Sequence, residues 1–348
     1  MANYFRRDLR STLPPSVLPD ISPMRGEIGD FGDTAKSPPL WGRCPAGQRE
    51  TRWVAKQSLS PSLLAVLLLA AFILPTAAES LKPFKDELFA YPGIISTGES
   101  GSYVVVDYDE MRDINGRDEI PERRVRAKYV ATGVRKVQKD LVLKSDAGDI
   151  RHVAVGAREG ARIITVYLHG QGGSRKQGVD DFTFGGNFNR IKNLMADNGG
   201  LFLSPDFADF GDAGAARVSA LITHYAAASP GAKIFIACGS MGGALCWKLA
   251  DDPAVAPRLS GLLLLGSHWD DAFPQSTAFK RKVPVFFGQG SRDTVFPVEK
   301  QEAFFRSIKA KSPAYPARFV RFETGSHGTP IRMTDWRDTL NWMISAAP

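Results

Sequence analysis

Six short apolar runs, each bounded by glycine, proline or aspartate, constrain the fold of this chain more than any other feature. Within each run the apolar residues occupy consecutive rather than alternate positions, which is typical of strands buried on both faces of a sheet. Such strands favour a mostly parallel sheet covered by helices on both sides. The runs are RIITVYLHG (162–170), GLFLSPD (200–206), KIFIACG (233–239), GLLLLGS (261–267), VPVFFGQG (283–290) and ARFVRFE (317–323).

Helical stretches separate these runs, and the alternation predicts a doubly wound α/β sheet in a single domain over residues 79–348. Four earlier segments indicate antiparallel strands at one edge of the same sheet. The predicted helices span 187–198, 215–228, 241–252, 298–309 and 335–346. The early strand segments are SYVVVDYDE (102–110), RVRAKYVA (124–131), KDLVLKS (139–145) and IRHVAVG (150–156).

A leader precedes this domain. The apolar run Leu63–Leu74 is followed by small residues and then by Glu79. Its length fits the hydrophobic region of a secretory signal peptide and falls short of the about 20 residues that a membrane-spanning helix needs. We therefore predict a signal peptide over about 54–78, cleavage near Ala78, and export to the periplasm or the extracellular space without a stable membrane span. A buried core helix is the alternative interpretation.

The residues before the signal peptide raise a question about the start site. Residues 1–53 are rich in proline, glycine, serine and arginine and have no sustained periodicity. Such a composition indicates a segment that is disordered or not normally translated. Translation from Val54 would make Lys56 the positive region of the signal peptide, and we offer this start as a hypothesis.

The charge excludes one class of partner. The chain carries a net charge of +7, of which the nine basic and six acidic residues before position 79 contribute three charges. The remaining +4 is mild and evenly spread, so nucleic acid is not an expected partner. The oligomeric state stays open.

Four motifs bear on the chemistry. In GSMGG (239–243), a serine lies between a predicted strand and a predicted helix, as in the G-x-S-x-G nucleophile elbow, but Cys238 stands two positions before Ser240 where glycine is usual. HGQGG (169–173) follows a buried strand; no G-K-[ST] follows it, so a phosphate-binding loop is not indicated. Asp293 follows a later strand in GQGSRDTVFP, and His327 follows the last strand in ETGSHGTP.

These motifs, from Tyr167 onwards, resemble the α/β-hydrolase superfamily, especially its small esterases and lipases with little or no cap. The resemblance implies a Ser240–His327–Asp293 triad, with the backbone N–H groups of Gln171 and Met241 holding the oxyanion. His327 is the only histidine after Asp293, whereas Asp206, Asp270 and Asp271 are rival acids. His169 is usually structural in such loops. No cofactor and no metal are expected.

The residues on either side of Ser240 are limited in size by the geometry of a nucleophile elbow. The strand and helix of such an elbow pass closely, so the neighbours of the serine must be small; Gly242 meets this need, and Cys238 should be buried beneath the turn. Two interpretations of Cys238 and Cys246 stay open. They are small core residues, or they form a disulfide, which an exported protein permits.

The substrate is less constrained than the chemistry. The loop between Gly266 and Val283 has room for little more than a turn or two, so an open site for a small-molecule or lipid-like carboxylic ester is expected. Candidate pocket residues are Phe182, Phe184, His268 and Trp269, with Phe188 and Phe273 as further candidates; simple packing is the alternative for each.

Other functions stay open. A peptidase, a thioesterase and a polymer depolymerase would use the same triad, because all share the acyl-enzyme route. A catalytically silent binding protein with this fold is an alternative from another class. MRDINGRDEIPE (111–122) matches part of a calcium-binding loop, but Met111 replaces the first ligand and Asp118 replaces an apolar residue.

Overall fold

The structure, a computed structural model, describes residues 80–119 and 124–348. The described residues fall within one compact unit. The predicted signal peptide, its cleavage near Ala78 and the Val54 start lie outside them. No helix in the described ranges is long and apolar enough to cross a membrane.

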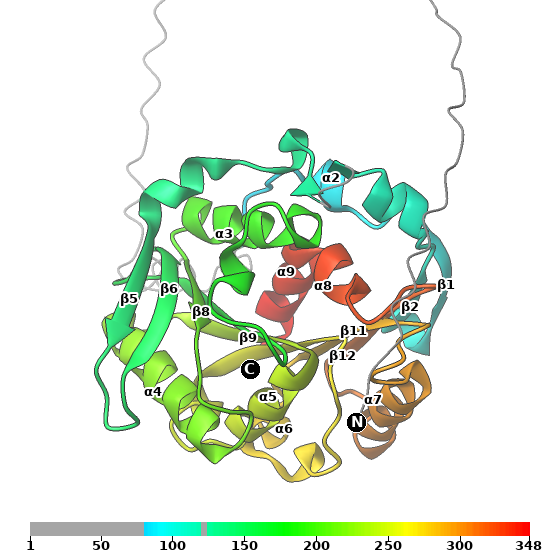
Figure 1. Cartoon of the computed structure of the whole chain (residues 1–348). Helices are drawn as coiled ribbons and strands as arrows, with labels where there is room; N and C mark the ends of the chain where they lie inside the picture. The colour runs from blue at the N-terminus through cyan, green and yellow to red at the C-terminus, as the bar shows by residue number, and fades with distance from the viewer. Residues whose placement is uncertain (1–79, 120–123) are drawn as a thin grey trace, which may run out of the picture. The chain divides into compact units, whose positions relative to one another are not determined.

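Ten strands of the described residues form one sheet, in the order β1-β2-β12-β11-β10-β9-β7-β8-β6-β5 (Figure 1). The strands from β8 through β7, β9, β10, β11 and β12 to β2 pair in parallel, which confirms the mostly parallel sheet. The bounds are β1 (Ile94–Gly98), β2 (Tyr103–Val106), β5 (Gln138–Leu143), β6 (Ile150–Gly156), β7 (Ile163–Leu168), β8 (Leu201–Pro205), β9 (Lys233–Gly239), β10 (Leu259–Leu265), β11 (Val285–Gly290) and β12 (Ala317–Phe322).

The early strands lie at both edges of the sheet, and not at one edge as predicted. β5 and β6 are antiparallel at one edge, whereas β2 pairs in parallel with β12 at the other and carries β1 antiparallel outside it. The pairing of β2 with β12 joins segments more than 200 residues apart, which local patterns do not encode. RVRAKYVA gives only β4 (Arg124–Val125), paired with β3 (Asp118–Glu119), and a 3-10 turn at Ala127–Tyr129.

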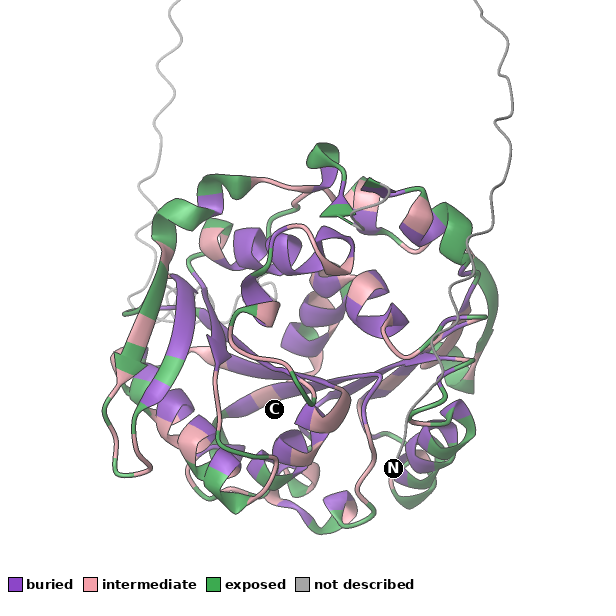
Figure 2. Ribbon diagram, viewed as in Figure 1, coloured by how far each residue is buried: buried purple, intermediate pink, exposed green. Residues whose placement is uncertain are grey.

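Helices cover both faces of the sheet (Figure 1). One apolar cluster joins the sheet to α4, α5, α6 and α7, and a second joins its other face to α3, α8 and α9. The central strands are therefore buried on both sides (Figure 2), and every residue of β7 is buried. The bounds are α2 (Asp86–Phe89), α3 (Asn187–Asp197), α4 (Asp212–Ala228), α5 (Gly243–Leu249), α6 (Thr277–Lys280), α7 (Val298–Lys311), α8 (Thr329–Met333) and α9 (Trp336–Ala346).

The strands β7, β9, β10, β11 and β12 are parallel, so their carboxyl ends all lie along the same side of the sheet, the side where the strands end and not at an outer strand. The loops that follow them bring together residues spread over more than 150 positions of the sequence. In open α/β sheets, ligand sites form at this edge.

Candidate active site

Ser240 occupies a tight turn between β9 and α5. Its φ is 52°, in the left-handed region, where a residue other than glycine costs about 1–3 kcal/mol. A Cβ on Gly242 would lie 2.4 Å from the carbonyl oxygen of Leu168, and one on Gly170 would lie 2.7 Å from the Cβ of Ser240. Glycine is therefore required at both positions for the loop after β7 to approach the serine.

His327 bridges Ser240 and Asp293. Its Nε2 lies 3.0 Å from the Ser240 Oγ, and its Nδ1 lies 2.8 Å from the Asp293 Oδ2. A carboxylate only accepts, so Nδ1 donates to Asp293 and leaves Nε2 as an acceptor for the serine hydroxyl proton. The Asp293 side chain is fully buried, whereas that of His327 is 30% exposed, so the histidine can meet a ligand.

Four donors hold the Asp293 carboxylate. The backbone N–H groups of Val295 and Phe296 donate to Oδ1 at 2.8 and 2.9 Å. The Nε2 of Gln289 donates to Oδ2 at 2.7 Å, alongside His327. Gln289 is buried on β11 and also donates to the Phe296 carbonyl. Gln289 belongs to none of the sequence motifs, although its place on the strand end four residues before Asp293 was a usable signal.

The rival acids have other partners. Asp206 accepts hydrogen bonds from the backbone and guanidinium of Arg175, and Asp270 caps the N–H of Ala272. Asp271 is exposed. Among these carboxylates, the structure brings only Asp293 to the imidazole of His327.

The two candidate oxyanion donors lie on either side of the serine. Met241 follows Ser240 in the 3-10 turn Ser240–Gly242, and the first N–H groups of a helix lack an intrahelical acceptor. Gln171 is exposed in the loop after β7, one residue beyond the close approach of Gly170 to Ser240. The Nδ1 of His169, at the start of this loop, donates to the Gly170 carbonyl at 2.8 Å, and burial lowers the pKa of the imidazole.

Aromatic rings line this region from two loops. Phe207, after β8, stacks on His169 with ring centroids 4.1 Å apart. The ring centroid of Phe296 lies 5.7 Å from that of His327 and 6.0 Å from that of His268, so His268 lies near the triad candidates. Neither Phe207 nor Phe296 was predicted as a pocket residue from the sequence.

The other pocket candidates pack elsewhere. Trp269 packs against the apolar cluster that includes α5 and α7, and Phe273 is buried in that cluster. Phe184 contacts the buried Phe188. Phe182 lies beneath the guanidinium of Arg124 and lines a cavity that Ser240 does not line. Contacts with neighbouring side chains account for the positions of all five of these residues.

Two further contacts support the elbow from below. Cys238 and Cys246 form a disulfide between β9 and α5, and both side chains are fully buried. Of the two alternatives left open by the sequence, the structure therefore has the disulfide. The hydroxyl of Ser267, in the loop after β10, donates to the Ser240 carbonyl at 2.5 Å, and the side-chain amide of Gln301 on α7 donates to the Ser267 carbonyl.

In the segment that partly matches a calcium-binding loop, the Asp113 side chain is paired with an arginine. The Asp113 carboxylate accepts from the Arg112 guanidinium at 2.8 and 2.9 Å. Glu122, the twelfth position of the match, lies outside the described residues. Within the described ranges, no group of three or more His, Cys, Asp or Glu residues is arranged to hold a metal ion.

Comparisons with known proteins relate the fold to solved structures. No protein-family model matches the sequence, and no curated protein matches it. A thermostable esterase has a TM-score of 0.50 at 14% identity, over 62% of this chain and 64% of its own. This domain has the α/β-hydrolase fold. A putative α/β-hydrolase from Agrobacterium tumefaciens is also similar, with a TM-score of 0.49 at 15% identity, over 60% of this chain and 99% of its own. An esterase from Pyrococcus furiosus has a TM-score of 0.45 at 15% identity, over 60% of this chain and 92% of its own.

In the α/β-hydrolase fold, the catalytic residues follow one another in a fixed order along the chain. Its nucleophile lies at a strand-to-helix turn, and the acid and then the histidine follow later in the chain. Here Ser240 follows β9, Asp293 follows β11 and His327 follows β12. The strand order β5-β6-β8-β7-β9-β10-β11-β12 places these loops at one edge of the sheet.

Proposed function

We propose that this protein is a serine hydrolase that cleaves carboxylic esters through an acyl-enzyme intermediate. The observation that carries the proposal is the continuous hydrogen-bond chain from Ser240 through His327 to Asp293, with distances of 3.0 and 2.8 Å. A nucleophile, a base and an orienting acid in hydrogen-bond reach are the groups that acyl transfer requires.

In this mechanism Ser240 attacks the acyl carbon while His327 takes the hydroxyl proton. Asp293 keeps the imidazole in the tautomer whose Nε2 accepts that proton, and its charge stabilises the imidazolium. The N–H groups of Gln171 and Met241 hold the tetrahedral oxygen, each worth about 3 kcal/mol in the transition state. His327 then protonates the leaving alcohol, and water repeats the cycle to release the acid.

The surroundings of Ser240 favour small or lipid-like esters. Between β10 and β11 the chain forms only the 3-10 turn Phe273–Gln275 and the four-residue helix α6, too little for a large cap. Phe207 and Phe296 are half-buried and offer apolar surface to an acyl or alcohol group. We expect the protein to hydrolyse esters faster than matched thioesters, amides or polymers.

The test is active-site labelling with a fluorophosphonate, followed by hydrolysis of a chain-length series of acyl esters beside thioester and amide analogues. Ser240→Ala and His327→Ala should each lower kcat by about 10⁴–10⁶-fold, because they remove the nucleophile and its base. Circular dichroism should show that both variants fold. A wild-type protein that neither labels nor turns over any ester would instead be a silent binding protein with this fold.

We also propose that the protein is exported. The buried Cys238–Cys246 disulfide supports this, because disulfides persist in oxidising compartments. Fractionation of producing cells and N-terminal sequencing of the mature protein test it. A mature chain beginning near Glu79 is expected; a full-length chain retained in the cytosol would contradict the proposal.

A further inference from the structure

The cavity that Phe182 lines has a volume of about 420 Å³ and is rich in positive charge. It lies between the start of β5, the 3-10 segment Thr132–Val137 and the loop 176–183. Its cationic lining residues are Arg124, Arg135 and Lys176, and its acidic ones are Asp180 and Asp181. None of the triad candidates lines it, so it is separate from the site described above.

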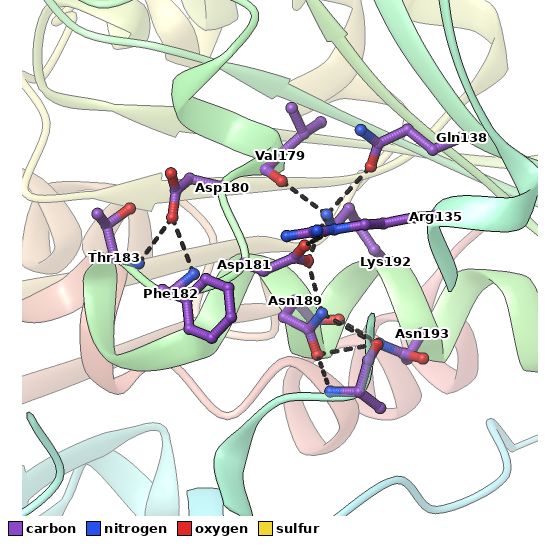
Figure 3. Close-up of polar contacts among 11 residues, drawn as sticks. Arg135, Gln138, Val179, Asp180, Asp181, Phe182, Thr183, Asn189, Lys192 and Asn193 are labelled. Carbon is purple, nitrogen blue, oxygen red and sulfur yellow. Dashed lines mark hydrogen bonds and ion pairs between the residues drawn. The ribbon is translucent and has the colours of Figure 1, made fainter. Parts of the chain in front are cut away.

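Beneath this cavity, the Asp181 carboxylate accepts from three side chains of the protein (Figure 3). Its Oδ1 lies 2.7 Å from the Nζ of the completely buried Lys192 and accepts from Asn189 at 2.6 Å. Its Oδ2 accepts from the Nε of Arg135 at 2.6 Å. Asp181 therefore neutralises the buried lysine, and donors from the protein take three of the about four acceptor positions of its carboxylate.

Asp180 is also engaged by its own loop. Its Oδ1 accepts the backbone N–H groups of Phe182 and Thr183, both at 2.8 Å (Figure 3). This arrangement is an Asx turn, which fixes the backbone of the loop. Asp180 makes no ion pair with Arg124, Arg135 or Lys176.

Several donors are left without an acceptor in the described part of the chain. Arg135 uses only Nε on Asp181, so its two Nη groups are unpaired. Arg124 stacks on the Phe182 ring at 4.2 Å and makes no hydrogen bond or ion pair through its guanidinium within 80–119 and 124–348. The Lys176 ammonium also makes no hydrogen bond or ion pair in these ranges, and the carboxylate whose charge it senses, Asp140, is bound by Arg175. Gln138 turns its oxygen to Lys192 at 3.1 Å, which leaves its amide N–H₂ as a further donor.

The two guanidinium groups are held in place before any ligand arrives. Arg135 is fixed by a charge-assisted bond to a buried carboxylate, and Arg124 by stacking on an aromatic ring. A fixed planar fork loses little entropy when it binds an oxyanion. With Lys192 included, the cavity has four cations and two carboxylates, a net formal charge of +2.

We propose that this cavity binds a tetrahedral dianion, a phosphate or sulfate group, between Arg124, Arg135 and Lys176. The charge of such a group matches the net +2 of the cavity, and its oxygens match the unpaired Nη, Nζ and amide donors. The source of the group is either a free anion or a monoester carried on a larger molecule. The proposal does not depend on the hydrolase activity, because its tests measure binding and thermal stability.

Isothermal titration and thermal shift with inorganic phosphate, sulfate and methyl phosphate, against sodium chloride of equal ionic strength, test the proposal. Phosphate and sulfate should bind and raise the Tm, and chloride should not. Arg124→Gln and Lys176→Gln should each weaken phosphate binding about tenfold or more, because each removes a charged donor. Binding of methyl phosphate as tight as that of phosphate would indicate a ligand-borne group; exclusion of the monoester would indicate the free anion.

Lys300→Gln is the matched control, since Lys300 is an exposed lysine on α7 and does not line the cavity. It removes one charge and should leave phosphate affinity unchanged. Circular dichroism confirms the fold of each variant; Arg124 and Lys176 are exposed, so unfolding is not expected. Equal loss of affinity in the control and in Arg124→Gln, or no phosphate binding above the chloride background, would overturn the proposal.

Discussion

Gln289 is tied to the candidate acid by a side-chain hydrogen bond that the motif does not contain. Its amide donates at 2.7 Å to both the Asp293 Oδ2 and the Phe296 carbonyl. It thereby fixes the carboxylate that orients His327, together with the turn that carries Phe296. At the scale of single residues, we therefore expect Gln289 to be a positioning residue for the proposed triad.

Replacing Gln289 by glutamate should separate positioning from packing. A second carboxylate beside Asp293 favours the protonated form of His327, and the base must be neutral to accept the serine proton. The acid limb of the kcat/KM profile should therefore move to higher pH. Gln289→Met, which keeps the volume without charge, should lower kcat about tenfold without moving that limb. An unchanged pH profile in Gln289→Glu would show that the residue only fills space.

Sequence reasoning named Ser240, Asp293 and His327 because each stands in a local motif at the end of an apolar run. It did not name Gln289, Phe207 or Phe296. The stacking of Phe207 on His169 joins loops after two different strands, and Phe296 meets His268 across the edge of the sheet. Such contacts depend on how strands are ordered, which no local spacing records.

At the scale of elements, the junction of β9 and α5 is held by its neighbours as well as by its own turn. Ser267, in the loop after β10, donates to the carbonyl of Ser240, and a Cβ on Gly243 would lie only 2.0 Å from the Ser267 hydroxyl. The start of this loop therefore packs directly against the strained turn. The hydrogen bond helps to hold Ser240 in the left-handed region of its φ.

Ser267→Ala should lower kcat about tenfold with little change in KM, because a misplaced nucleophile affects the transition state more than ground-state binding. Steady-state kinetics, with the ester that the wild-type protein hydrolyses fastest, measures both constants. Ser307→Ala is the control, since the Ser307 hydroxyl also donates to a backbone carbonyl, that of Phe304 on α7, away from the elbow. Equal losses in the two variants would indicate a general effect on stability.

The disulfide links the same two elements across a separation of eight residues. In the chain-entropy account, closing so short a loop stabilises the fold by about 2–3 kcal/mol. The double variant Cys238→Ala/Cys246→Ala should lose about this free energy of unfolding in urea. Because both sulfurs are fully buried, native protein should resist dithiothreitol, and thiol labelling should appear only after unfolding. Rapid labelling of the reduced, folded protein would contradict the buried position.

Element prediction succeeded where the pattern was local. The helices α3, α7 and α9 end within two residues of their predicted bounds, and each buried apolar run became a strand. It failed for the early segments, because β2 finds its partner in β12, the last strand of the chain. RVRAKYVA contains two valines and a tyrosine, yet Val125 and Tyr129 are buried against Phe89 and not in the ten-stranded sheet.

On the scale of the whole molecule, α3 connects distant parts of the chain through two fully buried cations. Arg190 pairs with Asp86 at 3.1 Å and with Asp335 at 3.0 Å, near the two ends of the described domain. Lys192, two residues further along the same helix, pairs with Asp181. Removing one member of such a pair leaves a buried charge without compensation, which costs more than the pair contributes.

The Asp181–Lys192 pair should make stability depend on pH. Burial raises the pKa of Asp181, but hydrogen bonds from Lys192 and Asn189 and the charge of Lys192 outweigh it, so the pKa is lowered. A carboxyl group with a depressed pKa in the folded state contributes stability above its unfolded pKa of about 4, and this contribution is lost as the pH falls through the folded value. The free energy of unfolding should therefore decrease on acidification below about pH 4.

Asp181→Asn should remove that acid dependence and cost about 3–5 kcal/mol at neutral pH, since Lys192 stays buried without its counter-ion. Burial already lowers the pKa of Lys192, and loss of Asp181 lowers it further, because the carboxylate was opposing that shift. The variant should therefore regain stability at alkaline pH, where its folded state holds a neutral lysine while the unfolded state still binds the proton. Urea unfolding from pH 3 to 10 measures both limbs.

Two further variants decide whether the buried pair is the cause. Asp212→Asn removes an acid from the exposed pair Lys248–Asp212 and should leave the unfolding midpoint unchanged across this pH range. Asp181→Asn combined with Lys192→Met removes both charges, so it should restore much of the lost stability and abolish the alkaline recovery. If the double variant kept that recovery, a different titrating group would be responsible, and the pair would not control the stability of the domain.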